Sequence, residues 1–232
     1  MNGAVAGLHD PGETVALSAR DGHTLSAYRA VPDRCRRGVV VAQESFGVTR
    51  HLRRVCDRLA AAGYAAIAPA LFDRARRGVE LGASPEEVAL GRELRGRIDP
   101  GAVLADLEAA ADALPRGIPV GLLGFRWGGT VAWWGATRLR RFAAASAWYG
   151  GGIAAARRER PACPVQMHFG EHDDSIPLSD VAAIRVAQPK VEIHVYPAAR
   201  HGFGCEERAT YSAPDAEAAW TRTHAFFARH LG

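Results

Sequence analysis

Residues 120–129 read Val120-Gly121-Leu122-Leu123-Gly124-Phe125-Arg126-Trp127-Gly128-Gly129. The apolar run at its start predicts a buried strand, and the residues from Trp127 to Thr137 predict a helix. Between them, glycines flank Arg126 in the pattern G-x-X-x-G, which is typical of a sharp turn that lifts its middle residue above a sheet. Taken alone, the segment also fits an ordinary tight turn between a strand and a helix.

Strands and helices alternate on both sides of this turn. Apolar or alternating runs predict strands at 38–42, 64–68, 119–124, 143–149, 164–169 and 191–196. Helical spacing or capping signals predict helices at 51–62, 84–98, 99–114, 127–137, 178–188 and 212–231. Residues 13–19 and 23–31 are expected to pair antiparallel around Asp21-Gly22. This alternation predicts an α/β fold, with a mostly parallel sheet and helices on both faces.

The chain has 232 residues, which fits a single domain over 1–232 better than two domains. No linker or internal repeat interrupts it, and we expect the first ten or so residues to be mobile. The N-terminus lacks a basic segment followed by an apolar run, so it does not resemble a signal peptide. No apolar stretch is long enough to cross a membrane. We therefore expect a soluble, cytoplasmic protein.

The formal net charge is +4, and the arginines are spread along the chain. The one tight basic cluster, Arg74, Arg76 and Arg77, is short and interrupted, so binding of nucleic acid is not expected. The four cysteines form no C-x-x-C pair, which gives no support for zinc or thioredoxin-like chemistry. We expect free thiols in a reducing compartment, no metal and no cofactor.

Two further polar segments follow predicted strands. Gly170-Glu171-His172-Asp173-Asp174-Ser175-Ile176-Pro177 comes after the strand that ends at Phe169, and His201-Gly202-Phe203-Gly204 comes after the strand that ends at Tyr196. Each taken alone fits a simple surface loop. Sites in such sheets lie at the carboxyl ends of the strands. The order of turn, acid and histidine along the chain is that of α/β-hydrolases, where an acid orients a histidine toward a nucleophile.

The motifs resemble those of the dienelactone hydrolase family over nearly the whole chain, from about Glu13. The turn resembles that family's G-[YF]-C-x-G-G, the acid loop its G-x-x-D-x-x-[VI]-P, and the last loop its H-x-F. Gln43-Glu44-Ser45-Phe46-Gly47 is similar to its Q-E-x-[FW]-G. The resemblance implies an α/β-hydrolase fold and hydrolysis of a carboxylic ester or lactone.

The resemblance also implies roles for individual residues. Asp173 would orient His201, and His201 would be the base. Glu44 would interact with the nucleophile in its resting state, and the backbone N–H groups of Ser45 and Trp127 would form the oxyanion hole. The family's nucleophile is a cysteine, activated as a thiolate by the histidine and the helix N-terminus.

This sequence departs from the family at the nucleophile, where it carries Arg126. A guanidinium has five donors and no usable lone pair, so it cannot attack a carbonyl carbon. It also places a positive charge at the positive end of a helix, which predicts a partner such as Glu44. Ser45 and Cys205 are weak candidates for a replacement nucleophile.

Three functional hypotheses follow from this departure. The chain is a dienelactone hydrolase-like ester or lactone hydrolase whose nucleophile has been substituted; or it is a lyase, isomerase or cyclase that uses Arg126 as an electrostatic clamp; or it binds a ligand without turnover. The expected partner is a small molecule, such as an ester or lactone that carries a carboxylate. Dienelactone-cleaving members have an arginine where this chain has Cys205. Arg74, Arg76, Arg77 or Arg126 could bind an acidic substrate instead.

Overall fold

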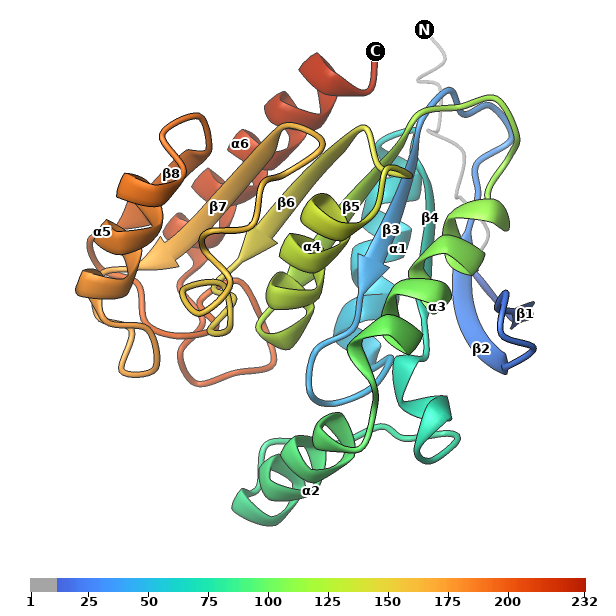
Figure 1. Ribbon diagram of the computed structural model, residues 1–232, viewed down its shortest axis with the longest axis horizontal. Coiled ribbons are helices and arrows are strands. Elements are labelled where there is room, and N and C mark those ends of the chain that lie inside the picture. The colour runs from blue at the N-terminus through green and yellow to red at the C-terminus, as the bar shows by residue number, and fades with distance from the viewer. Residues whose placement is uncertain (1–11) are drawn as a thin grey trace, which may run out of the picture.

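The computed structural model describes residues 12–232, so the expected mobility of the first residues concerns a segment outside it. Within the described residues, eight strands form one sheet in the order β1-β2-β4-β3-β5-β6-β7-β8 (Figure 1). The strands are β1 (Glu13–Ser18), β2 (Thr24–Ala30), β3 (Gly38–Ala42), β4 (Ala65–Pro69), β5 (Val120–Phe125), β6 (Ala144–Trp148), β7 (Val165–Gly170) and β8 (Glu192–Tyr196). β2 pairs antiparallel with both β1 and β4, and all other neighbours are parallel.

Helices cover both faces of this sheet. They are α1 (Arg50–Ala61), α2 (Pro85–Gly96), α3 (Pro100–Asp112), α4 (Trp127–Arg138), α5 (Leu178–Ala187) and α6 (Ala213–His230). Figure 1 shows α3, α4 and α5 in front of the sheet and α1 and α6 behind it. The helices behind are in contact, since the guanidinium of Arg58 lies 4.5 Å from the centroid of the Trp220 ring. The predicted α/β-hydrolase architecture is confirmed.

The residue types explain why these elements form. β3, β4, β5, β6 and β7 are buried along their whole length, which is what continuous apolar runs in a parallel sheet require. The start of α2 is fixed by a capping box, in which Ser84 and Glu87 each accept from the other's backbone N–H. Asp99 caps α3 by accepting from the N–H groups of Gly101 and Ala102.

The structure differs from the sequence prediction in small ways. Strand and helix boundaries move by one or two residues, and a short 3₁₀ helix, η1 (Leu71–Arg74), follows β4 where no element was predicted. A single turn of this kind carries too little periodicity to be found from sequence. The four cysteines are free thiols, as expected.

The arrangement of the strands positions the candidate site. Four candidate side chains follow the carboxyl ends of parallel strands, which lie at the same edge of the sheet. They are Glu44 after β3, Arg126 after β5, Asp173 after β7 and His201 after β8. Helix α2 lies beyond that edge, away from the two helix layers (Figure 1). Residues of α2 line the cavity at this end of the sheet together with Ser45, Arg126 and His201.

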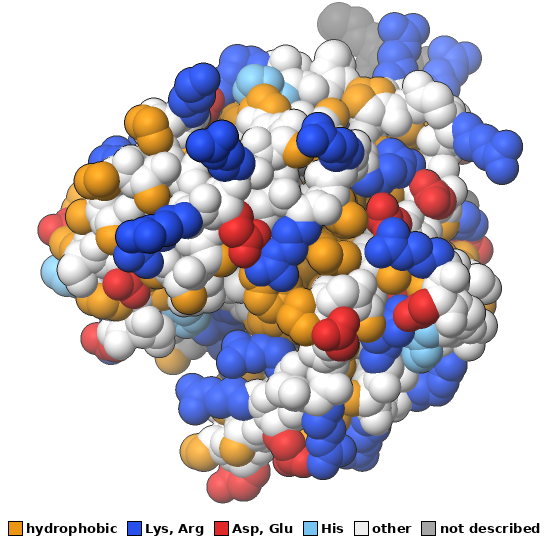
Figure 2. Space-filling model, viewed as in Figure 1, with side chains coloured by type: hydrophobic (Ala, Val, Ile, Leu, Met, Phe, Trp, Pro, Cys, Tyr) orange, Lys and Arg blue, Asp and Glu red, His pale blue; other side chains and the backbone are white. Residues whose placement is uncertain are grey.

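On the face shown in Figure 2, lysine and arginine side chains are scattered, with acidic side chains among them. The absence of nucleic-acid binding stays a prediction. No helix in the described part of the chain has the length and apolarity of a membrane span.

Candidate active site

Arg126 occupies a strained turn between β5 and α4. Its backbone has φ 55° and ψ −118°, a region that residues with a side chain rarely adopt. Its N–H donates to the carbonyl of Trp148 at 3.0 Å, so β5 stays paired to β6 up to the turn. A Cβ on Gly124 would lie 1.9 Å from the carbonyl oxygen of Gly128, and one on Gly128 would lie 2.3 Å from that of Ala42. The flanking glycines are thus required by space, and the segment is the predicted elbow.

The predicted acid and base are in contact. His201 Nδ1 lies 2.8 Å from Asp173 Oδ2. The other oxygen of Asp173 accepts from the N–H groups of Ser175 at 2.8 Å and Ile176 at 3.0 Å, and none of its side chain is exposed. Because a carboxylate held in this way only accepts, it favours the imidazole tautomer that carries its proton on Nδ1 and leaves Nε2 as a base.

The neighbouring acid, Asp174, has a different environment. Its side chain is exposed and pairs with Arg200 at 2.6 Å. Both aspartates lie in the predicted acid loop. The structure separates them, since only Asp173 reaches His201.

The side chain of Arg126 lies against Glu44 and Gly202. Its Nε is 3.2 Å from Glu44 Oε1, which gives the predicted ion pair, although the angle does not allow a hydrogen bond. A Cβ on Gly202 would lie 1.7 Å from Nη2 of Arg126, so the guanidinium rests on the backbone next to His201. Its centre is also 5.9 Å from the ring centroid of Tyr149.

Four of the predicted residues line one cavity of about 740 Å³. These are Ser45, Arg126, Trp127 and His201, with Glu44 and Asp173 buried behind them. Trp127 is the first residue of α4, so its N–H has no acceptor within the helix. The cavity thus brings together a base, a cation and the two residues expected to form the oxyanion hole.

Sequence reasoning missed the basic residues that α2 adds to this cavity. Arg92 and Arg95 line it, and among the described residues neither has an acidic side chain within 4.0 Å. Partial desolvation, and then the charge of Arg92, lower the pKa of Arg95. Two arginines on a helix normally indicate a solvated face, so only the position of α2 over the sheet reveals them.

The arginines proposed from sequence as substrate ligands lie elsewhere. Arg74 is held by Asp106, with Nε to Oδ2 at 2.7 Å, and by Asp21 at 2.8 Å. Arg77 donates to the carbonyl oxygen of Thr24 at 2.6 Å, and Arg76 is exposed. None of the three lines the cavity. Their positions do not support the proposed role in substrate binding. The guanidinium of Arg74 is already paired with Asp21 and Asp106.

Cys205 does not line this cavity either. It is buried and lines a separate small cavity together with Glu44. Trp127 and Trp134 also line the main cavity, whereas Trp133 and Trp148 are wholly buried in the core.

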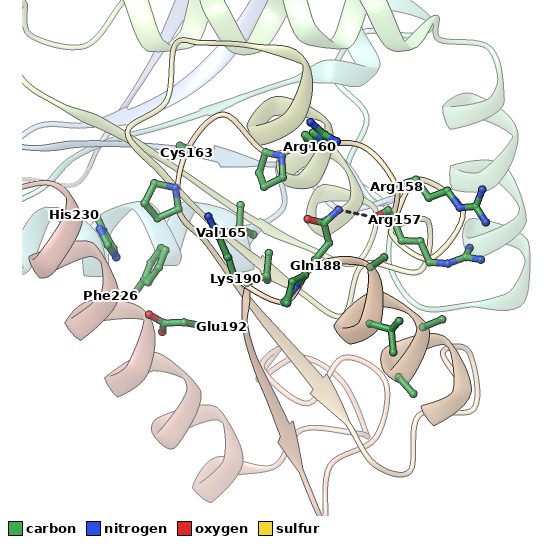
Figure 3. Close-up of a pocket in the computed structure, with 18 residues that line it drawn as sticks. Arg157, Arg158, Arg160, Cys163, Val165, Gln188, Lys190, Glu192, Phe226 and His230 are labelled. Atoms are coloured by element: carbon green, nitrogen blue, oxygen red, sulfur yellow. Dashed lines mark hydrogen bonds between the residues drawn. The ribbon is translucent and has the colours of Figure 1, made fainter.

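A larger cavity, of about 1310 Å³, lies at the opposite end of the strands (Figure 3). Val165 and Glu192, which begin β7 and β8, lie on its wall, so it faces the amino ends of these strands. Gln188 donates to the carbonyl of Arg157 at 2.6 Å across one side of it. No predicted site residue lines it, so size alone does not identify the active site.

Comparison with known proteins agrees with the geometry. A model of the dienelactone hydrolase family matches residues 25–231. Proteins named "Putative carboxymethylenebutenolidase" are similar: one from Synechocystis is 38% identical over 83% of this chain and 86% of its own, and one from Escherichia coli K12 is 36% identical over 91% and 84%. A solved structure of a "Putative Dienelactone Hydrolase" from Klebsiella pneumoniae has a TM-score of 0.79 and 33% identity, and covers 94% of this chain and 99% of that one.

Proposed function

We propose that this chain, which belongs to the dienelactone hydrolase family, hydrolyses small carboxylic esters or lactones that carry a second carboxylate, and does so without an acyl-enzyme intermediate. The observation that carries this proposal is the hydrogen bond between Asp173 and His201, at 2.8 Å, on a cavity that Arg126 also lines. A protein that only bound a ligand would have no need of an oriented base.

Water takes the place of the missing nucleophile in this mechanism. His201 Nε2 accepts a proton from a water molecule as the water oxygen attacks the carbonyl carbon. The negative charge that develops on the carbonyl oxygen is stabilised by the N–H groups of Ser45 and Trp127. The carbon–oxygen bond to the leaving group then breaks, and His201 returns the proton to the departing oxygen. One ester and one water thus give one acid and one alcohol.

The basic side chains select the substrate. Within the described residues the side chain of Arg126 makes no hydrogen bond to protein, and its Nη atoms are left to bind an anion beside His201. Arg92 and Arg95 add positive charge on the α2 side of the same cavity. A carboxylate placed among them would be bound by charge-assisted hydrogen bonds, which arginine makes in a bidentate manner.

The test is hydrolysis of a lactone carboxylate and of a p-nitrophenyl ester by the intact chain and by His201→Ala. General bases contribute about 10²–10⁴ in rate, so the variant should lose activity by that factor. His172→Ala is a matched control, because His172 is exposed in the acid loop and should be silent. Equal loss in both variants, or no loss in His201→Ala, would contradict the proposal.

Arg126 favours one other candidate, a lyase, isomerase or cyclase in which the guanidinium stabilises an enolate or carboxylate and His201 moves a proton. The two functions are distinguished by isotope labelling. Hydrolysis in H₂¹⁸O places one ¹⁸O in the carboxylate product, whereas these non-hydrolytic reactions incorporate none.

A further inference from the structure

Three buried side chains from distant parts of the chain place metal-binding atoms close together. Glu44 follows β3, His51 lies in the first turn of α1, and Cys205 follows the His201 loop. A carboxylate oxygen, a ring nitrogen and the Sγ atom lie within 4.8 Å of one another. We propose that Glu44, His51 and Cys205 bind a zinc-class divalent cation.

Two buried polar atoms of these residues make no hydrogen bond to the protein. Glu44 Oε1 and His51 Nε2 are buried and make no hydrogen bond within the described structure. The residues are 1% and 7% exposed, and Cys205 is 2% exposed. A buried polar atom without a partner is costly and rare in folded proteins, so this pair needs an explanation. A cation between them would satisfy both atoms at once.

The chemistry of the three donors selects the ion. Thiolate, imidazole and carboxylate are the ligands of Zn²⁺, whereas Ca²⁺ and Mg²⁺ require oxygen donors alone. Tetrahedral Zn²⁺ with bonds of about 2.0–2.3 Å places its ligand atoms about 3.3–3.7 Å apart. Donors within 4.8 Å therefore need to move inward by about 1 Å, which side-chain rotation supplies. The edge-to-face contact of the His51 and Phe125 rings, at 5.6 Å, holds the imidazole near this geometry.

The same three residues do not suit covalent catalysis. The cavity that they line measures about 70 Å³, and it is also lined by Thr49, Leu81, Gly82, Ala83, Glu207 and Arg208. That volume holds an ion with a water molecule or two, and it is far below the ~300 Å³ typical of sites for organic ligands. Burial also raises the pKa of the Cys205 thiol to about 11, so the free thiol is protonated at neutral pH.

The positive charge of Arg126 lies next to the proposed cation site. The Nε atom of Arg126 is 3.2 Å from Oε1 of Glu44, a ligand of the proposed ion. The positive charge weakens cation binding, so removing it in Arg126→Ala should tighten binding. The metal site uses Glu44, His51 and Cys205, whereas the proposed hydrolysis uses Asp173, His201 and Arg126.

The experiment is titration of the full chain, freed of metal with chelator and desalted, with ZnCl₂ by calorimetry and with CoCl₂ by absorption. We expect one ion per chain and a sulfur-to-cobalt charge-transfer band. Loss of a residue that only supports a ligand costs about 10–100-fold in affinity, so Cys205→Ser and His51→Gln should each weaken binding at least that much. CaCl₂ should give no saturable heat.

Matched controls keep the result specific. Cys163→Ser removes another partly buried thiol, and His194→Gln removes a partly buried imidazole away from the cluster; both should bind as the parent does. Circular dichroism checks that each variant is folded. If Cys205→Ser does not fold, the test rests on His51→Gln. Absence of saturable binding, or binding that survives both cluster variants, overturns the site. Neither readout depends on ester hydrolysis, so the site can fail while the proposed function stands, and the reverse.

Discussion

Nε of Arg126 lies 3.2 Å from Oε1 of Glu44, and this contact joins the elbow after β5 to the loop after β3. The family resemblance assigns that glutamate to the resting nucleophile. Here it faces a cation instead, next to a helix N-terminus where positive charge is unfavourable. The carboxylate that would regulate a thiolate has become the counter-ion of a guanidinium.

We expect Glu44→Gln to destabilise the fold, because it leaves the Arg126 charge without a partner. Breaking a fully buried pair costs about 3–5 kcal/mol, and the loss here should be smaller since 16% of the Arg126 side chain is exposed. Urea unfolding measures it. Glu80→Gln, in the exposed pair with Arg53, is the control and should cost below ~1 kcal/mol. In the double variant Glu44→Gln/Arg126→Gln part of the loss should return; simple additivity would refute the pairing.

Asp173→Asn should lower hydrolysis by about 10²–10⁴, the range of general-base catalysis, since the amide no longer holds His201 in the tautomer that leaves Nε2 free. The matched control is Asp174→Asn, one residue along, whose carboxylate pairs with Arg200 at the surface. Turnover at saturating and at low substrate separates orientation of the base from binding. Equal effects of the two substitutions would argue against the Asp173–His201 pair as the working dyad.

Arg126→Cys should convert the enzyme to one that forms an acyl-enzyme. The thiolate would sit at the N-terminus of α4 beside His201, where its ionised form is favoured. With p-nitrophenyl acetate we expect a burst of p-nitrophenol equal to the enzyme concentration and a higher rate than in the intact chain. Arg126→Ala should show no burst and should lose affinity for carboxylate-bearing substrates. A burst in the intact chain would mean that another residue attacks the ester.

Gly124→Ala and Gly128→Ala should each cost at least about 1–3 kcal/mol of stability, because the added Cβ would lie within 2.3 Å of a backbone oxygen. Gly96→Ala is the control, since a Cβ there at the end of α2 meets nothing within 4 Å. It should be neutral or slightly stabilising. Thermal unfolding of the three variants decides; a well-folded Gly124→Ala would show that the elbow can open.

Buried thiols predict a loss of stability at alkaline pH. Burial raises the pKa of Cys205 from its ordinary value near 9 to about 11, and it raises that of Cys56 as well. Below pH 9 the thiols are protonated in both the folded and the unfolded chain, and their contribution to the free energy of unfolding is complete. Between pH 9 and 11 the unfolded chain ionises first and is favoured, so stability falls. Urea midpoints under reducing conditions with chelator measure this, and Cys205→Ala should fall less steeply than the parent.

The alternating pattern was sufficient to predict the parallel sheet, the helix layers and the elbow. Each depends on local signals, such as the apolar run into Gly124 or the capping box at Ser84. The pairing of Asp173 with His201 was also accessible, because both follow strands that end at one edge.

Other parts of the site depend on tertiary structure alone. Arg92 and Arg95 enter the cavity only because α2 lies across the sheet edge, and nothing in their spacing distinguishes them from a solvated helix face. Arg74 was expected near the substrate, but Asp106 on α3 holds it. The cluster of His51 with Cys205 joins segments more than a hundred residues apart, so no motif of fixed spacing could predict it.

The strained conformation of Arg126 has an evolutionary consequence. Its positive φ is imposed by the close approach of Gly124 and Gly128 to neighbouring backbone, and not by the side chain at 126 itself. The scaffold therefore specifies a location in space and leaves its chemical identity open. A single codon change can exchange a nucleophile for a cation there while the surrounding framework stays in place. Loss and recovery of covalent catalysis are therefore separated by a single substitution. Position 126 is also a suitable place to introduce a new catalytic side chain by design.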